Sequence, residues 1–162
     1  MSKPWFKQYD SWVPHEIDMS RYGNVVEMLL ESGEKFSDHV AFSNFGATKT
    51  YADVLSLSRD FAAYLQNELG VVKGDRVALM SPNMMAFPVA MLGILRAGGV
   101  QVNVNPLYTA RELEHQLNDA DVETIVVLSG STGTLAEVIG NTGIKNVIVA
   151  GLDDLNDLGL PS

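Results

Sequence analysis

The stretch that decides the fold runs from Gly74 to Leu117 and reads GDRVALMSPNMMAFPVAMLGILRAGGVQVNVNPLYTARELEHQL. The chain carries 20 Asp and Glu residues, yet positions 76–110 contain none of them. Because an unpaired charge in an apolar interior costs several kcal/mol, this gap predicts a buried segment. RVALM and VQVNV are typical of strands, and MMAFPVAMLGIL between them is typical of an apolar helix. The stretch therefore predicts a βαβ unit that is covered on both faces.

The composition is that of a globular protein. The chain has 162 residues, of which 46% are hydrophobic and 19% charged, enough for one domain with a single core. A net charge of −9 argues against binding nucleic acid or an anionic membrane by charge, because both need clustered Lys and Arg. Cysteine is absent, which excludes disulfides and thiolate chemistry and is compatible with a reducing cytoplasm.

The sequence shows no targeting or spanning segment. The first residues lack the apolar core of a signal peptide. The longest apolar run, 87–95, is far shorter than the roughly 20 residues that cross a bilayer. We expect a soluble, cytoplasmic protein.

The chain divides into three predicted parts. Residues 1–23 are rich in Trp, Tyr and Pro, and we interpret them as an irregular arm whose aromatic side chains pack on the body, since exposed aromatics are a liability. Residues 24–150 are expected to form an α/β domain. Residues 151–162 are expected to form an acidic, flexible tail.

The first half of the domain shows three local signals. Asn24 is a plausible cap for a helix over 25–36, which Gly33 weakens. The segments 40–45 and 48–51 flank Gly46-Ala47 and predict a hairpin. An amphipathic helix is expected from about 52 to 68, with Gly70 as its stop.

The second half predicts a sheet. Four apolar strands are expected to begin near residues 76, 100, 124 and 146, with a helix in each gap, which indicates right-handed crossovers and a mostly parallel sheet. Pro88 is expected at the first position of its helix, and Gly98-Gly99 at the helix stop. Thr109 and Glu112 fit a capping box for the next helix. The fold class is α/β, a mostly parallel sheet with flanking helices plus a short N-terminal hairpin.

One segment imitates a phosphate-binding loop. Ser129-Gly130-Ser131-Thr132-Gly133-Thr134 lies between a predicted strand and a predicted helix, where amides can hold a phosphate. A phosphate loop normally adds a Lys, but Ala136-Glu137 follows here. We therefore interpret the segment as a Gly-rich loop in which Thr132 or Thr134 caps the helix.

The remaining polar candidates have structural explanations. His15, His39 and His115 are isolated in sequence, which argues against a metal site. Asn103 and Asn105 flank a strand end, where turn capping accounts for Asn105-Pro106. The following carboxylates are interpreted as solvated charge on one helix face and its loop: Glu112, Glu114, Asp119, Asp121 and Glu123. No constellation among these residues predicts catalysis.

The stretch from Gly74 to Ala120 closely resembles the adenylate-forming enzymes and, among them, the bacterial long-chain fatty acid–CoA ligases. KTYADVLSLSRDFAAYL resembles their first conserved block, and GILRAGGVQVNVNPLYTARELEHQL resembles their second. The opening PWFKQYDSWVPHEID is also similar, so the likeness covers residues 1 to about 150. Ala110 departs from the family pattern, which has Pro in NPLYTPREL, at a cost in pre-organisation of the helix.

The resemblance implies a two-step reaction for a parent enzyme, of which this chain is the N-terminal part. ATP and a fatty acid give an acyl-adenylate and pyrophosphate with Mg²⁺, and coenzyme A then displaces AMP. The family's Lys-containing phosphate loop lies beyond residue 162. No catalytic, cofactor-binding or metal residue of the family carries over to a position here, and the chain alone is expected to be inactive.

Three expectations about partners follow. The main partner is the remainder of the parent enzyme, and bare apolar surface favours a homo-oligomer of this chain. The parent's lipid substrate implies peripheral contact with the inner face of a membrane. The alternative function is a stand-alone module that binds a nucleotide or small ligand at the strand ends near Ser81, Asn105 and Ser129.

Overall fold

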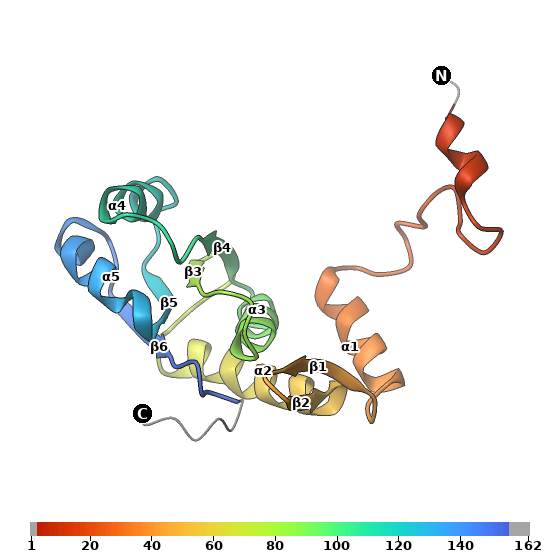
Figure 1. Ribbon diagram of the computed structural model, residues 1–162, viewed down its shortest axis with the longest axis horizontal. Coiled ribbons are helices and arrows are strands. Elements are labelled where there is room, and N and C mark those ends of the chain that lie inside the picture. Colours follow the sequence, from red (N-terminus) through yellow and green to blue (C-terminus); the bar gives the residue numbers. More distant parts are fainter. Residues whose placement is uncertain (1–2, 156–162) are drawn as a thin grey trace.

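The computed structural model describes residues 3–155 (Figure 1). The strands of its main sheet are β3 (Arg76–Met80), β4 (Val100–Val104), β5 (Thr124–Leu128) and β6 (Asn146–Ala150). The helices are α1 (Val25–Lys35), α2 (Tyr51–Asn67), α3 (Ala86–Arg96), α4 (Ala110–Asp119) and α5 (Thr132–Val138). A hairpin of β1 (Val40–Asn44) and β2 (Ala47–Thr50) precedes α2.

The main sheet is parallel throughout, with the strand order β4-β3-β5-β6. The chain steps from β3 outward to β4, crosses back over β3 to β5, and then continues to β6. Both the predicted strand starts and the helix in each gap are confirmed. The strand order reverses between β3 and β5, so the sheet is doubly wound.

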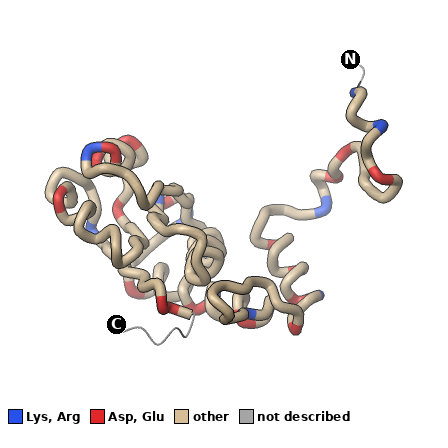
Figure 2. Tube along the Cα trace, viewed as in Figure 1, with Lys and Arg blue, Asp and Glu red and all other residues tan. Residues whose placement is uncertain are grey.

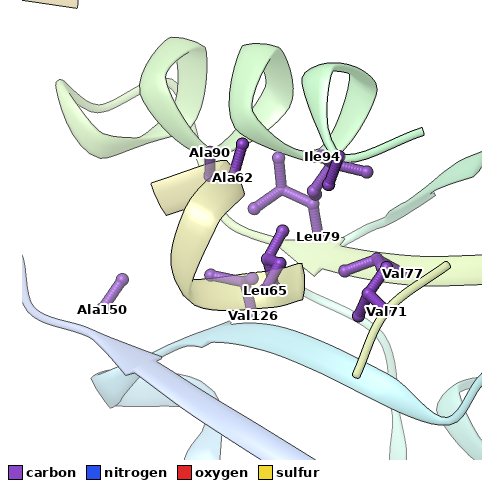
Figure 3. Packing of buried hydrophobic residues seen from close by; sticks show 10 residues of the cluster. Ala62, Leu65, Val71, Val77, Leu79, Ala90, Ile94, Val126 and Ala150 are labelled. Carbon is purple, nitrogen blue, oxygen red and sulfur yellow. The ribbon is translucent and has the colours of Figure 1, made fainter. Parts of the chain in front are cut away.

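Two apolar clusters lie on the two faces of the sheet. On one face α2 and α3 pack over β3 and β5, where Leu65, Val77 and Ile94 are completely buried (Figure 3). On the other face α4 and α5 pack over the same strands around Leu113, Leu117 and other fully buried residues. The strand β3 is therefore covered on both sides, as its carboxylate-free sequence predicts.

The carboxylate-free stretch is the centre of the fold. In Figure 2, where Asp and Glu are red, the tube of α3 and β4 has no red segment, because positions 76–110 contain neither residue. Four of the five residues of β3 are buried, and the helix after it buries five residues. Two large apolar side chains of the stretch are exposed: Leu107 is 86% exposed in the turn before α4, and Val100 is 50% exposed at the start of β4.

Helix ends follow the capping signals in the sequence. The Asn24 side chain accepts a hydrogen bond from the Glu27 amide at 2.9 Å, and Thr109 forms the predicted capping box with Glu112. At the end of α3 Gly98 has a φ of +86°, and the Gly99 amide donates to the Ile94 carbonyl at 2.9 Å. This pattern closes the last turn and confirms the glycine stop.

Two local predictions need correction. The hairpin turns at Phe45-Gly46 and not at Gly46-Ala47, because the φ values of Phe45 (49°) and Gly46 (87°) are both positive, as a type I′ turn requires. The helix α3 begins at Ala86, which places Pro88 at its third position instead of its first. Proline is tolerated there because the amides of the first turn have no partner within the helix.

The N-terminal arm does not pack on the body as predicted. Its aromatic rings contact one another: Phe6 stacks on His15 with ring centroids 4.1 Å apart, and Tyr9 meets both rings edge-on. Trp12 is 79% exposed, and Figure 1 shows the arm extending from α1 away from the sheet. The ring contacts that the arm makes within the described residues 3–155 are thus all internal to the arm. The predicted flexible tail lies mainly outside the described residues, which end at Leu155.

Candidate functional site

The carboxyl ends of β3 and β5 form the topological switch point, where doubly wound sheets place ligands. Ser81, Asn105 and Ser129 lie at this edge, each just after a strand. Their polar groups already have local partners: the Ser81 hydroxyl donates to the Pro82 carbonyl, and Asn105 Oδ1 accepts from the Leu107 amide at 3.0 Å. The Ser129 carbonyl accepts from the Thr132 hydroxyl at 2.8 Å. The hydrogen bonds at this edge therefore stabilise local turns.

The segment Ser129–Thr134 does not have the form of a phosphate cradle. Residues Ser129–Ser131 form a 3-10 turn, and α5 begins at Thr132. The expected Thr cap is wrong, because Ser131 occupies the cap position without a side-chain cap bond and the Thr132 hydroxyl turns back to the preceding turn. Ser131 is buried and its hydroxyl donates to the Pro106 carbonyl at 3.3 Å. The hydroxyls of Ser131 and Thr132 therefore tie the loop to the protein, and the segment contains no Lys to neutralise a phosphate.

An apolar groove between the hairpin and α3 is the feature that sequence reasoning missed. It has a volume of about 340 Å³ and includes Phe42, Met84 and Phe87 among its lining residues. The Asn44 amide nitrogen donates to the Asn83 carbonyl at 3.4 Å at its rim. The segments that flank Gly46-Ala47 indicated the hairpin, but no signal in the sequence placed the hairpin against the start of α3.

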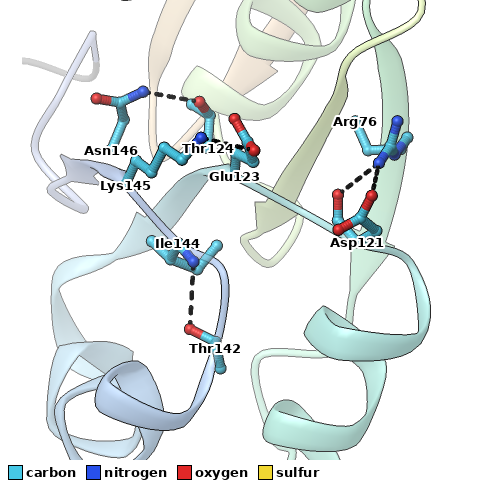
Figure 4. A network of polar contacts seen from close by, with 8 residues as sticks. All are labelled: Arg76, Asp121, Glu123, Thr124, Thr142, Ile144, Lys145 and Asn146. Carbon is cyan, nitrogen blue, oxygen red and sulfur yellow. Dashed lines mark hydrogen bonds and ion pairs between the residues drawn. The ribbon is translucent and has the colours of Figure 1, made fainter.

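The opposite, amino edge of the sheet carries a polar network (Figure 4). Arg76 donates to the Ala120 carbonyl at 3.2 Å and the Asp121 carbonyl at 2.9 Å, and it pairs with the Asp121 carboxylate. Lys145 pairs with Glu123 at 2.7 Å. The Arg76 guanidinium therefore satisfies the carbonyl of Ala120, the C-cap of α4, and that of the following residue, at the end of the helix where a cation is stabilising.

The carboxylates singled out in the sequence have structural contacts. Glu112 accepts hydrogen bonds from the Thr109 hydroxyl and amide at 2.7 and 2.9 Å, and these bonds lower the pKa of Glu112 below its ordinary value. Glu114 accepts from the Asn141 side chain at 3.3 Å. Asp121 and Glu123 form the ion pairs just described, and Asp119 is exposed at the end of α4. Their geometry is that of caps and surface ion pairs.

The histidines lie apart. His15 stacks within the arm, His39 meets Phe36 edge-on, and His115 is exposed on α4. Across residues 3–155, no three His, Asp or Glu side chains converge as a metal site would require. No helix within the same range is both long and apolar enough to cross a bilayer.

The open parallel sheet, wound in both directions with helices on both faces, places the chain in the doubly wound α/β class. A model of the family described as AMP-binding enzyme matches residues 29–158. The chain belongs to the AMP-binding enzyme family.

Individual relatives agree with this assignment. The chain is 49% identical over 154 residues to a long-chain-fatty-acid–CoA ligase of Escherichia coli O6:H1, a match that covers 95% of this chain and 28% of the relative. It is 47% identical to the ligase of Yersinia pestis over 95% of this chain and 27% of the relative. The crystal structure of a long-chain-fatty-acid–CoA ligase from Archaeoglobus fulgidus superposes with a TM-score of 0.71 at 25% identity, over 83% of this chain and 30% of that one. The chain thus spans under a third of the length of these relatives.

Proposed function

We propose that this chain forms the amino-terminal part of a long-chain fatty acid–CoA ligase. The observation that carries the proposal is the 49% identity to such a ligase over 95% of the chain. In the proposed reaction a carboxylate oxygen of the fatty acid attacks the α-phosphorus of ATP, and pyrophosphate leaves. The thiolate of coenzyme A then attacks the acyl carbon, and AMP leaves with the bridging oxygen, which gives acyl-CoA.

The role proposed for these residues is structural. ATP, coenzyme A and Mg²⁺ are the proposed cofactors of the whole enzyme. The segment Ser129–Thr134 does not fit a triphosphate, because the hydroxyls of Ser131 and Thr132 donate to backbone carbonyls and the segment lacks a Lys. No reaction step is therefore assigned to a residue of this chain. Its two-faced core supplies a rigid sheet on which the rest of the enzyme is built. The partner proposed for this chain is that remaining polypeptide.

The proposal is tested with the polypeptide that continues this sequence to the length of its relatives. Purified protein is incubated with ATP, Mg²⁺, coenzyme A and palmitate, and palmitoyl-CoA and AMP are measured by mass spectrometry. Equal amounts of both products, dependent on each substrate, are expected. AMP formation with a short aromatic acid and none with palmitate would overturn the assignment to fatty acids, and absence of AMP with every acid would overturn the ligase function.

A further inference from the structure

The N-terminal arm, residues 3–23, contains its own ring cluster of Phe6, Tyr9 and His15. Phe6 lies in the 3-10 turn Pro4–Gln8, and its stacking on His15 folds the arm back on itself. None of the side chains in residues 3–23 is buried. The arm is therefore a folded hook, and the side chains outside the ring cluster are held in solvent.

The arm exposes five large apolar side chains, which are between 42% and 83% exposed: Trp5, Tyr9, Trp12, Ile17 and Met19. Soluble proteins rarely leave such side chains together in water, and exposed apolar surface of this kind marks an interaction site. Both tryptophans of the chain are in this group. An indole ring has an apolar body and one N–H donor, so the boundary between a lipid bilayer and water suits it well.

The charge of the arm differs from that of the rest of the chain. Residues 3–23 contain three basic and three acidic residues, so the net charge of −9 belongs entirely to residues 24–162. The segment 3–9, KPWFKQY, has Lys3 and Lys7 beside its aromatic rings and no carboxylate. An anionic lipid surface attracts these lysines and repels the acidic body. The argument from net charge against membrane binding therefore applies to the body and not to this segment.

The arm also lies apart from the acidic body. Figure 1 shows it extending from the start of α1 away from the sheet. Because salt screens exposed charges beyond about 8 Å under physiological conditions, an arm held away from the body can contact an anionic surface with little repulsion from the body. The match to the AMP-binding enzyme family begins at residue 29, so the arm precedes the part of the chain that this family shares.

We propose that the arm binds the surface of a phospholipid bilayer. The indole rings of Trp5 and Trp12 supply the apolar contact in the headgroup region, and Lys7 adds attraction to the phosphates of anionic lipids. The ring cluster keeps the arm folded before it binds, which lowers the entropy lost on binding. The inference goes beyond the proposed function and does not depend on it, because membrane binding is measured without substrates.

Tryptophan fluorescence of the 162-residue chain tests the proposal, because Trp5 and Trp12 are the two tryptophans of the chain. With vesicles of phosphatidylcholine and phosphatidylglycerol, the emission is expected to shift to the blue and to be quenched by brominated lipids. Emission that does not change with vesicles would overturn the proposal. A blue shift that follows protein concentration and not lipid concentration would assign the arm to a second copy and would overturn it as well.

Substitutions in the full-length polypeptide, which continues this sequence to the length of its relatives, show which residues bind. Trp12→Ala is expected to lower the partition coefficient into the same vesicles about 10-fold, as the loss of one large buried side chain does. Leu107→Ala, which alters a leucine that is 86% exposed on the body, is the matched control and should leave the coefficient unchanged. Equal partition coefficients of the two variants would overturn the proposal.

A charge variant tests the part assigned to lysine. Lys7→Gln is expected to weaken binding to vesicles that contain phosphatidylglycerol about 5-fold and to leave binding to pure phosphatidylcholine unchanged. Lys7 is chosen because the ammonium group of Lys3 already lies 4.0 Å from the Glu16 carboxylate. An equal effect on both kinds of vesicle would overturn the contact of Lys7 with anionic lipid.

Hydrogen exchange of the full-length polypeptide separates a membrane from the remainder of the enzyme as the arm's partner. The amides of residues 5–20 are expected to exchange more slowly with vesicles than without them, and slow exchange without vesicles would overturn the proposal. Palmitoyl-CoA formation is measured on the same preparation. An active enzyme whose arm ignores vesicles overturns only this inference, and an inactive protein whose arm binds them overturns only the proposed function.

Discussion

Gly93 of α3 lies against Phe61 of α2 so closely that a Cβ added to the glycine would be 2.6 Å from the Phe61 ring. The same Cβ would be 3.2 Å from the Ser58 carbonyl oxygen, which belongs to the backbone and cannot yield easily. The contact sets the distance between the two helices that cover one face of the sheet. Arg96 joins the same two helices one turn further along α3, since its guanidinium donates to the Leu55 carbonyl at 2.8 Å.

Gly93→Ala is expected to destabilise the chain. Overpacking a helix contact costs about 1–3 kcal/mol, of which the better helix propensity of alanine returns about 1 kcal/mol. Urea unfolding measures the difference. Gly133→Ala in α5 is the matched control, because a Cβ there meets no atom within 4 Å, and it should be neutral or stabilising. Equal free energies of unfolding for the two variants would contradict the close contact.

The capping box of α4 predicts a pH dependence. The Thr109 hydroxyl and then its amide lower the pKa of Glu112 from its ordinary value of 4.5, so the folded state holds this carboxylate more strongly ionised than the unfolded state does. The stabilisation is therefore complete above the unfolded pKa and is lost as pH falls through the lower, folded pKa.

Glu112→Gln should thus lose stability at neutral pH and show a shallower decline below about pH 4.5. Thr109→Ala, which removes the hydroxyl partner, should flatten the same part of the curve. Chemical unfolding from pH 7 to pH 3 measures both. If the unfolding free energies of both variants change with pH in parallel with those of the unsubstituted chain, the capping box does not contribute to the pH dependence of stability.

The two kinds of contact that Arg76 makes are expected to contribute differently to the free energy of unfolding. Arg76→Lys loses the fork that reaches the carbonyls of Ala120 and Asp121, and we expect a loss of about 1–2 kcal/mol. Asp121→Asn removes only an exposed ion pair, which is typically worth under about 1 kcal/mol, and asparagine tolerates the φ of 49° at this position. A larger loss of unfolding free energy for Asp121→Asn than for Arg76→Lys would show that the ion pair, and not the carbonyl contacts, is the stronger interaction.

Ala110→Pro is expected to stabilise the chain by about 0.4–1 kcal/mol. Ala110 is the first residue of α4, where proline needs no amide partner. The preceding residue, Thr109, has an extended backbone (φ −67°, ψ 160°), which a following proline favours. Thermal unfolding measures the gain, and Ala136→Pro inside α5 is the control that should destabilise. A lower melting temperature for Ala110→Pro would show that the helix start is strained.

Much of the fold could be predicted because its signals are local. The carboxylate-free stretch and the even strand spacing indicated the parallel sheet, and Asn24, Thr109 and Gly98 marked helix ends by their own local chemistry. Contacts between distant segments could not be predicted in this way. Gly33 was interpreted as a weakness of α1, whereas a Cβ there would lie 2.8 Å from Leu55, so the glycine permits close packing of α1 on α2.

The arm and the candidate site show the same limit. Aromatic composition predicted that the arm packs on the body, but composition does not say which surface an aromatic ring contacts, and Phe6, Tyr9 and His15 contact one another. The loop Ser129–Thr134 has the residue types of a phosphate cradle, yet the hydroxyl of Ser131 is directed to Pro106 of a neighbouring loop. Only the three-dimensional arrangement separates these two uses of the same residues.

The central claim is that these residues form the scaffold of a ligase and that nucleotide chemistry belongs to polypeptide outside them. Titration calorimetry of the 162-residue chain with ATP·Mg²⁺, AMP and octanoate, each in a separate experiment, tests it most directly. The predicted result is no saturable heat with any of the three. Saturable binding of ATP or AMP that is lost in Thr132→Val would contradict the claim and would make a nucleotide-binding module at the carboxyl ends of β3 and β5 the better account.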